Sequence, residues 1–146
     1  MSLLKKFFGD SPSTPKQKYH FIIVDDSLFD LLLTEKTIKN LNRHQSVHTF
    51  TTGGELIYHF NTHHYDDDSR IVLFIDIQMP NKTGIETIKA LNTIINVDLK
   101  NKIAVFFLTA SLNQEDFEQV KEISNQYEYV IKPISETVVK ELVEAL

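Results

Sequence analysis

Two apolar runs, one at 71–75 and one that makes up most of 102–110, constrain the fold of this chain most strongly. Both are rich in Ile, Val and Phe, and neither alternates polar with apolar residues. β-branched and aromatic residues favour strands, and strands without alternation are covered on both faces. Such strands occur in parallel sheets with helices packed on each side. The two runs therefore predict an α/β protein with these segments as central strands.

The remaining sequence alternates between strand-like and helix-like segments. Helix segments carry apolar residues at a spacing close to 3.6, and Ser27, Ser111 and Ser135 stand where N-caps are expected. Strands are predicted over 19–26, 46–52, 71–77, 102–110 and 127–133. Helices are predicted over 28–41, 53–61, 84–96, 112–126 and 135–146, with loops at 63–70 and 97–101. Five strand–helix repeats predict a parallel sheet with helices on both faces.

Composition limits the function more than it defines it. A net charge of −5 and a pI of about 5.6 argue against a nucleic-acid-binding protein. The chain has no cysteine, and no apolar run approaches the length of a membrane span. The Pro- and Ser-containing residues 1–18 are expected to be a flexible arm or linker, followed by one domain over 19–146, without a further domain. We expect a cytoplasmic protein.

Chemically active residues stand where the predicted strands end. Asp25 and Asp26 follow the first strand, Asp76 ends the third, Thr109 ends the fourth, and Lys132 ends the fifth. Ligands of open parallel sheets bind at the carboxyl ends of the strands. The sequence therefore predicts that three carboxylates, one hydroxyl and one ammonium group meet at one edge of the sheet.

The charges of this set indicate its chemistry. Each residue alone has an ordinary structural reading, as a cap, a strand-end hydroxyl or a surface lysine. Three neighbouring carboxylates repel one another unless they share a cation, and a site of oxygen ligands suits Mg²⁺. Mg²⁺ and Lys132 both attract a phosphoryl group, which Thr109 can hydrogen-bond. Asp76 is then placed to attack phosphorus and form an aspartyl-phosphate.

Four motifs in this arrangement give the chain a resemblance to a known family. They are "VDD" at 24–26, "DIQMPNKTG" at 76–84, "LTA" at 108–110 and "KP" at 132–133. As a set they resemble the response-regulator receiver domain of two-component signalling, in its single-domain, chemotaxis-regulator-like form. The resemblance extends over 19–146. It implies a flavodoxin-like (βα)5 doubly wound sandwich with strand order 2-1-3-4-5.

The resemblance also implies a metal site and a phosphorylation site. Asp76 matches the phosphoacceptor, and Asp25 and Asp26 match the acidic pair that binds Mg²⁺ or Mn²⁺, with the second acid as the direct ligand. The backbone carbonyl of Gln78 is expected to complete the protein ligands. Lys132 is expected to contact the phosphoryl group. The side chain of Gln78, with that of Ser111, is expected to tune how long the phosphate persists.

Three further positions match the family's switch. Thr109 matches the switch hydroxyl, Ala110 the small residue beside it, and Tyr129 the aromatic residue that turns inward after phosphorylation. The surface formed by 112–126, 127–133 and 135–146 is then expected to change. The loop over 61–69 is a candidate for partner specificity.

These roles imply partners and exclude others. The phosphoryl donor is expected to be a sensor histidine kinase or a histidine phosphotransfer protein, and the output an unknown protein that binds the altered surface. Direct nucleic-acid binding is not expected, and a homodimer through that surface is possible. The domain is expected to catalyse only its own phosphorylation and dephosphorylation. The alternatives are a Mg²⁺-dependent phosphohydrolase with Asp76 as nucleophile, against which Gln78 argues, and a phosphate-independent binding module.

Weaker patterns receive structural interpretations. His59 and His63 are four residues apart and His64 and 66–68 lie near, so a zinc site is conceivable, but a solvated polar loop is preferred because no third ligand is fixed. The Gly53–Gly54 pair lacks the residues of a phosphate-binding loop, which disfavours a flavin-binding protein. Phe106 and Phe107 are interpreted as strand core.

Overall fold

The five predicted strands form one parallel sheet in the predicted order. A computed structural model of the chain describes residues 16–111, 113–123 and 127–146. The strands pair in the order β2-β1-β3-β4-β5, and every pair is parallel. They are β1 (Tyr19–Val24), β2 (His44–Phe50), β3 (Ile71–Asp76), β4 (Ile103–Thr109) and β5 (Glu128–Ile131). Of the predicted arm over 1–18, residues 1–15 lie outside the described part of the chain.

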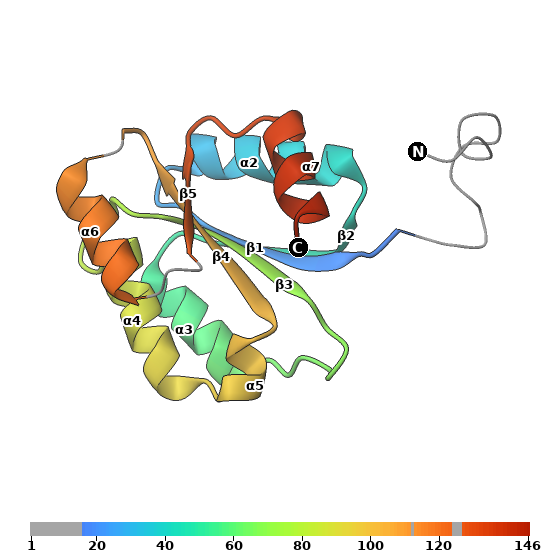
Figure 1. Cartoon of the computed structure of the whole chain (residues 1–146), viewed down its shortest axis with the longest axis horizontal. Helices are drawn as coiled ribbons and strands as arrows, with labels where there is room; N and C mark the ends of the chain where they lie inside the picture. The colour runs from blue at the N-terminus through green and yellow to red at the C-terminus, as the bar shows by residue number, and fades with distance from the viewer. Residues whose placement is uncertain (1–15, 112, 124–126) are drawn as a thin grey trace.

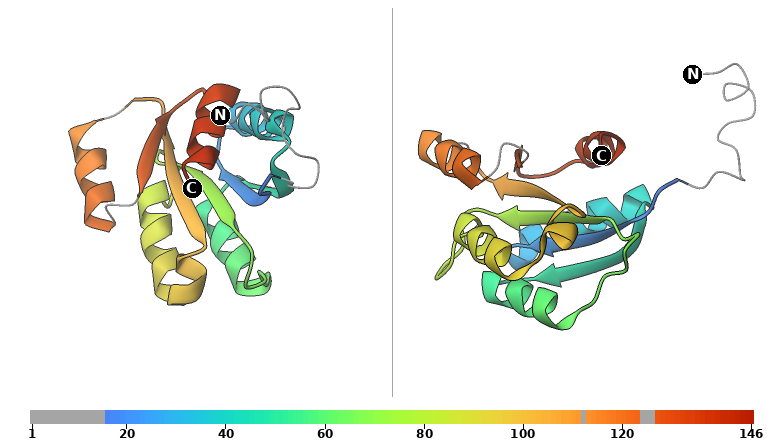
Figure 2. Two further views of the ribbon diagram at one scale, coloured as in Figure 1. Left: turned by 45° about the vertical axis from the view of Figure 1, so that its right-hand side comes forward. Right: turned by 60° about the horizontal axis from the view of Figure 1, so that its bottom comes forward.

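Helices cover both faces of this sheet, as Figures 1 and 2 show. The helices α2 (Leu28–Leu41) and α7 (Glu136–Glu144) lie on one face. On the other face lie α3 (Gly53–Thr62), α4 (Gly84–Ile94) and α6 (Gln114–Ile123). This is the predicted doubly wound sandwich. None of the helices described is long and apolar enough to cross a membrane.

The central strand β3 explains the absence of polar alternation in its sequence. All six of its residues are buried. Ile71, Leu73 and Ile75 pack in the core beneath α3, α4 and α6, whereas Val72 and Phe74 pack beneath α2 and α7. Because each face of the strand meets a separate apolar core, both sets of side chains have to be apolar.

Two of the three serines predicted to be helix N-caps take that position in the structure. The hydroxyl oxygens of Ser27 and Ser135 accept hydrogen bonds from the first turns of α2 and α7. The prediction for Ser111 is wrong: Asn113 accepts the backbone hydrogen bond of Asp116 at 2.8 Å, two residues later. Asparagine is as good a cap as serine, and Ser111 instead bonds Thr109.

One predicted loop is also wrong. Residues 97–100 form a single helical turn, α5 (Val97–Lys100), rather than an irregular loop. Asn96 caps this turn by accepting from the backbone N–H of Leu99 at 2.8 Å. A turn this short has no apolar period, so periodicity could not reveal it.

Candidate functional site

The carboxyl ends of β1, β3, β4 and β5 bring the predicted site residues to one edge of the sheet. Asp76 is the last residue of β3, and its register partner on β4, Leu108, directly precedes Thr109. Asp25 is fully buried and Asp76 is only 4% exposed, whereas Asp26 is exposed. Carboxylate oxygens of Asp25, Asp26 and Asp76 all lie within 4.8 Å of one another. The predicted acidic cluster is therefore present, and we call it the acid pocket.

Lys132 lies in the middle of the acid pocket. Its Nζ is 3.1 Å from Asp25 Oδ2, 3.4 Å from Asp76 Oδ2 and 2.9 Å from Asp30 Oδ2. Burial alone would lower the pKa of Lys132, but hydrogen bonds with Asp30 and Asp25 and the charge of Asp76 outweigh it and raise that pKa. The ammonium group therefore stays charged and holds the carboxylates together.

Asp30 is the member of this group that the sequence analysis missed. It lies in the first turn of α2, three residues after the Ser27 cap, and its backbone N–H donates to Ser27 Oγ at 3.3 Å. The helix start faces the same edge of the sheet as the strand end before it. The available sequence signal for Asp30 is an acid in the first helical turn after "VDD". The apolar periodicity of this segment predicts a helix but assigns no role to that acid.

The backbone around Asp76 is held in a tight arrangement. Its Oδ1 accepts from the N–H of Gln78 at 3.2 Å, and the N–H of Gly84 donates to the carbonyl of Ile77 at 3.0 Å. A Cβ atom on Gly84 would lie 2.2 Å from the backbone oxygen of Asp76. Only glycine permits the start of α4 to pass this close to the end of β3.

The acid pocket raises the pKa of Asp76 to about 6. Burial is the largest cause and repulsion by Asp25 the second, and Lys132 and the Gln78 N–H only partly oppose them. A further cation bound beside Asp76 would stabilise its ionised form and lower its pKa.

The donor atoms of the acid pocket fit a hard divalent cation. Asp25, Asp26, Asp30 and Asp76 provide four carboxylates, and among the described residues the one ammonium group paired with this set is that of Lys132, which contacts all but Asp26. The group therefore carries a net negative charge, and its potential metal ligands are oxygen atoms. This is the donor type that Mg²⁺ prefers and Mn²⁺ accepts. The predicted ligand role of the Gln78 carbonyl stays a prediction.

Thr109 and Ser111 form a local turn at the edge of the acid pocket. Thr109 Oγ1 donates to the backbone carbonyl of Ser111 at 2.6 Å and accepts from its N–H at 3.2 Å. The hydroxyl is thus at the predicted strand end but engaged within its own loop. Ala110 between them is exposed.

Tyr129 joins β5 to α6. Its hydroxyl donates to the backbone carbonyl of Asp116 at 2.6 Å, and its ring stacks on Phe117 with centroids 5.8 Å apart. The Gln78 side chain reaches the same helix, with Nε2 3.4 Å from Asp116 Oδ2. One helix therefore contacts both the predicted aromatic switch residue and the loop that follows Asp76.

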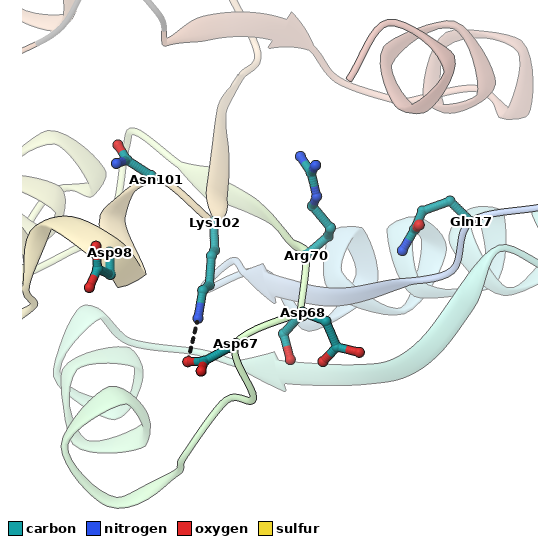
Figure 3. A pocket seen from close by; sticks show the side chains of 8 residues that line it. Gln17, Asp67, Asp68, Arg70, Asp98, Asn101 and Lys102 are labelled. Atoms are coloured by element: carbon teal, nitrogen blue, oxygen red, sulfur yellow. Dashed lines mark ion pairs between the residues drawn. The ribbon is translucent and has the colours of Figure 1, made fainter.

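A separate hollow lies at the opposite edge of the sheet. Figure 3 shows its lining, which includes Asp67 and Arg70 before β3 and Lys102 before β4. It measures about 690 Å³, and Lys102 Nζ is 3.6 Å from Asp67 Oδ1. These residues precede the strands, whereas the acid pocket follows them. The hollow is therefore not part of the predicted site.

Known proteins of solved structure share this fold. A response regulator receiver protein from Dyadobacter fermentans is 27% identical, with a TM-score of 0.73 over 87% of this chain and 96% of its own. A two component response regulator from Cytophaga hutchinsonii is 24% identical, with a TM-score of 0.75 over 89% and 97%. The chemotaxis protein CheY4 of Vibrio cholerae is 20% identical, with a TM-score of 0.71 over 88% and 98%.

Comparison with curated protein sequences gave no match. The family model described as the response regulator receiver domain matches residues 21–144, which include every residue of the acid pocket. With the parallel sheet, the buried aspartates and the central lysine, this match shows that the chain belongs to the response regulator receiver domain family.

Proposed function

We propose that this receiver domain accepts a phosphoryl group on Asp76 and signals through a surface that changes when Asp76 is phosphorylated. The observation that carries the proposal is the contact of one lysine with two buried aspartates from different strands, Lys132 with Asp25 and Asp76. Burying such charges is costly, and their arrangement around an acid at a strand end supports a reactive rather than a structural role.

The proposed step is an in-line transfer from a phosphohistidine. A carboxylate oxygen of Asp76 attacks phosphorus, the P–N bond to the donor imidazole breaks, and the imidazole leaves with the electron pair and takes a proton. Lys132 holds a phosphoryl oxygen as the charge moves, and Asp25 and Asp26 with the Gln78 carbonyl would hold Mg²⁺ or Mn²⁺. Such an ion supplies charge neutralisation on the phosphoryl oxygens. Water later attacks the acylphosphate, which releases phosphate and restores the carboxylate.

The output is proposed to pass through Thr109 and Tyr129. The Thr109 hydroxyl, now bonded to the Ser111 carbonyl, would exchange that acceptor for a phosphoryl oxygen. The loop around Ala110 would move with it, and the contact of Tyr129 with α6 would change in turn. An unidentified protein would read the resulting surface of α6, β5 and α7, which a second copy of the chain could also use.

A docking surface for the phosphoryl donor is proposed on α2. Leu28, Phe29 and Leu32 are exposed apolar residues at the start of this helix, and Phe29 is 74% exposed. The same helix turn carries Asp30 of the acid pocket. A sensor histidine kinase or a histidine phosphotransfer protein that covers these side chains would place its phosphohistidine beside Asp76.

Intact-mass measurement tests the central step. After incubation with acetyl phosphate and Mg²⁺, the wild-type chain should gain one adduct of about 80 Da, the mass of a phosphoryl group. Asp76→Asn should gain none. Asp67→Asn, at the exposed hollow on the opposite edge, is the matched control and should react like the wild type.

The same assay separates this role from the alternative functions. No adduct on the wild type, or an equal adduct on Asp76→Asn, would overturn the proposal. Repeated turnover of a phosphomonoester that depends on Asp76 would instead favour a phosphohydrolase. We propose that the domain turns over no metabolite and catalyses only its own phosphorylation and dephosphorylation.

A further inference from the structure

Three histidine side chains converge at a second place in the molecule, remote from the acid pocket. His59 lies in α3 and His63 at its C-cap, and His48 comes from the edge strand β2. His48 and Phe50 project from the same face of β2, because they are two residues apart, and both rings contact His59. The fold thus supplies the third histidine that the sequence spacing of His59 and His63 left unidentified.

The three rings are close enough to share one ion. The ring centroids of His59 lie 4.8 Å from those of both His48 and His63, and those of His48 and His63 are 5.5 Å apart. One nitrogen from each ring lies within 4.8 Å of the others. Imidazole nitrogens around a tetrahedral Zn²⁺ are separated by about 3.4 Å, given Zn–N bonds of about 2.0–2.1 Å. Binding of one ion would therefore require side-chain rotations that bring the nitrogens up to about 1.4 Å closer together.

A neighbouring tyrosine supports the orientation of the innermost histidine. His59 is only 8% exposed, and its Nε2 lies 2.6 Å from the hydroxyl oxygen of Tyr65. Histidine ligands usually engage their second ring nitrogen with a fixed partner of this kind, which leaves the other nitrogen free for the metal. His63 is exposed and His48 is half-buried, so an ion could enter from the solvent side.

Electrostatics favour the uncharged form of two of these imidazoles, His59 and His48, at neutral pH. Burial, together with repulsion by His48 and His63, lowers the pKa of His59 to about 4, and burial followed by His63 also lowers the pKa of His48. Neutral imidazole is the form that binds metals.

We propose that His48, His59 and His63 form a binding site for a divalent transition-metal ion of the zinc type. Imidazole ligands select Zn²⁺, Ni²⁺ or Cu²⁺ over Mg²⁺, so this site and the acid pocket prefer different ions. Three protein ligands leave one tetrahedral position for water. The inference does not depend on phosphoryl transfer. The alternative interpretation of these ring contacts is an aromatic cluster that packs without a metal ion.

Calorimetric titration of the full chain with Zn²⁺ tests the proposal. The buffer contains excess Mg²⁺ at pH 7.5, which competes with Zn²⁺ for the acid pocket. One ion per chain is expected to bind with micromolar or tighter affinity.

Single substitutions locate the ion. His63→Ala and His48→Ala should each weaken binding by about 100-fold or more, and Tyr65→Phe by about tenfold, within the range known for partners of metal ligands. His64→Ala is the matched control, because His64 is exposed, adjacent to His63 and not part of the cluster. It should bind like the wild type. Asp76→Asn should also leave Zn²⁺ binding unchanged.

Three results would overturn the site. They are the absence of saturable binding below about 100 μM, equal losses in His64→Ala and His63→Ala, or loss of binding in Asp76→Asn. Circular dichroism checks that each variant is folded. If His48→Ala fails to fold, His63→Ala decides the outcome, because its exposed side chain can be removed without opening the core.

Discussion

At the scale of single residues, Lys132 joins carboxylates that belong to three separate elements. Asp25 follows β1, Asp30 begins α2, and Asp76 ends β3, and each lies within 3.4 Å of the same ammonium nitrogen. A buried charge is tolerated when it is paired, but here three carboxylates share one ammonium group, so their mutual repulsion is only partly offset. The acid pocket therefore has a stability cost that depends on its ionisation state.

Asp76→Asn should stabilise the metal-free domain at neutral pH. The pKa of Asp76 is raised from 3.8 to about 6, so the folded state binds this proton more tightly than the unfolded state does. Proton binding by Asp76 therefore stabilises the folded state. This contribution is fully present below about pH 4 and is lost as the pH rises through about 6. Asparagine does not ionise and avoids the loss, so we expect a gain of about 1–3 kcal/mol at pH 7.

Urea denaturation at several pH values measures this effect. The difference between variant and wild type should be small near pH 4 and largest above pH 6. Excess Mg²⁺ should reduce it, because the ion binds the wild-type carboxylates and stabilises the folded state. A difference that is independent of pH would show that Asp76 does not titrate as inferred.

Gly84→Ala should destabilise the domain and slow phosphorylation by acetyl phosphate. The added Cβ would lie 2.2 Å from the Asp76 backbone oxygen, so β3 and α4 would have to separate. We expect a loss of about 1–3 kcal/mol, as for other overpacked sites. Gly54→Ala is the matched control, since its Cβ meets nothing nearer than Thr52 Oγ1 at 3.9 Å.

Chemical denaturation and the rate of adduct formation by mass spectrometry check this prediction. Gly54→Ala should be neutral or stabilising by up to about 1 kcal/mol, because alanine favours helices over glycine. Equal effects of the two substitutions would contradict the argument from close approach.

At the scale of elements, α6 is attached to the sheet by few contacts. Val120 is its one fully buried apolar residue among those described, and the Tyr129 hydroxyl donates to its first turn. By contrast, α4 buries Ile85, Ile88 and Leu91. An element held by two side-chain hydrogen bonds, from Tyr129 and Gln78, and by little buried apolar area suits the proposed output surface.

Tyr129→Phe should therefore weaken the attachment of α6. It removes the 2.6 Å hydrogen bond to the Asp116 carbonyl and leaves the ring contacts with Phe117 intact. We expect a loss of about 0.5–1.5 kcal/mol in the free energy of unfolding, measured by urea denaturation. Tyr58→Phe on α3 is the control, because that ring is 70% exposed. A neutral Tyr129→Phe would show that the bond does not secure the helix.

At the scale of the whole molecule, local sequence patterns predicted the sheet and the acid pocket better than they predicted contacts between distant segments. The apolar runs identified β3 and β4, because strands covered on both faces must be apolar throughout. The strand-end rule then placed Asp25 and Asp76 together before any distance was known.

The residues that the sequence analysis missed depend on tertiary contacts. Asp30 joins Lys132 across about a hundred positions of chain, and His48 meets α3 only after β2 has paired with β1. Neither contact leaves a periodic or spaced pattern, and the one local signal, an acid in the first turn of α2, does not indicate Lys132 as its partner. The sequence pattern favours Ser111 as the cap of α6. Asparagine caps helices as well as serine does, so only the backbone path shows that Asn113 takes this position.

The central position of β3 has a consequence for amide hydrogen exchange. This strand is paired with β1 and β4 along its length, and both of its faces are buried. Its amide protons should then exchange with solvent only when the entire domain unfolds. Those of β2 and β5, which pair on one side, should exchange through smaller openings.

Exchange measured residue by residue would test this order. The slowest amides should be those of β3, with protection factors on the order of 10⁴ or more for a domain of ordinary stability. Equal protection in β2 would contradict it. If the order holds, the strand that ends in Asp76 is also the slowest part of the chain to open. The proposed phosphoacceptor then stands on the most persistent structure of the domain, whereas the proposed output surface is among the least persistent.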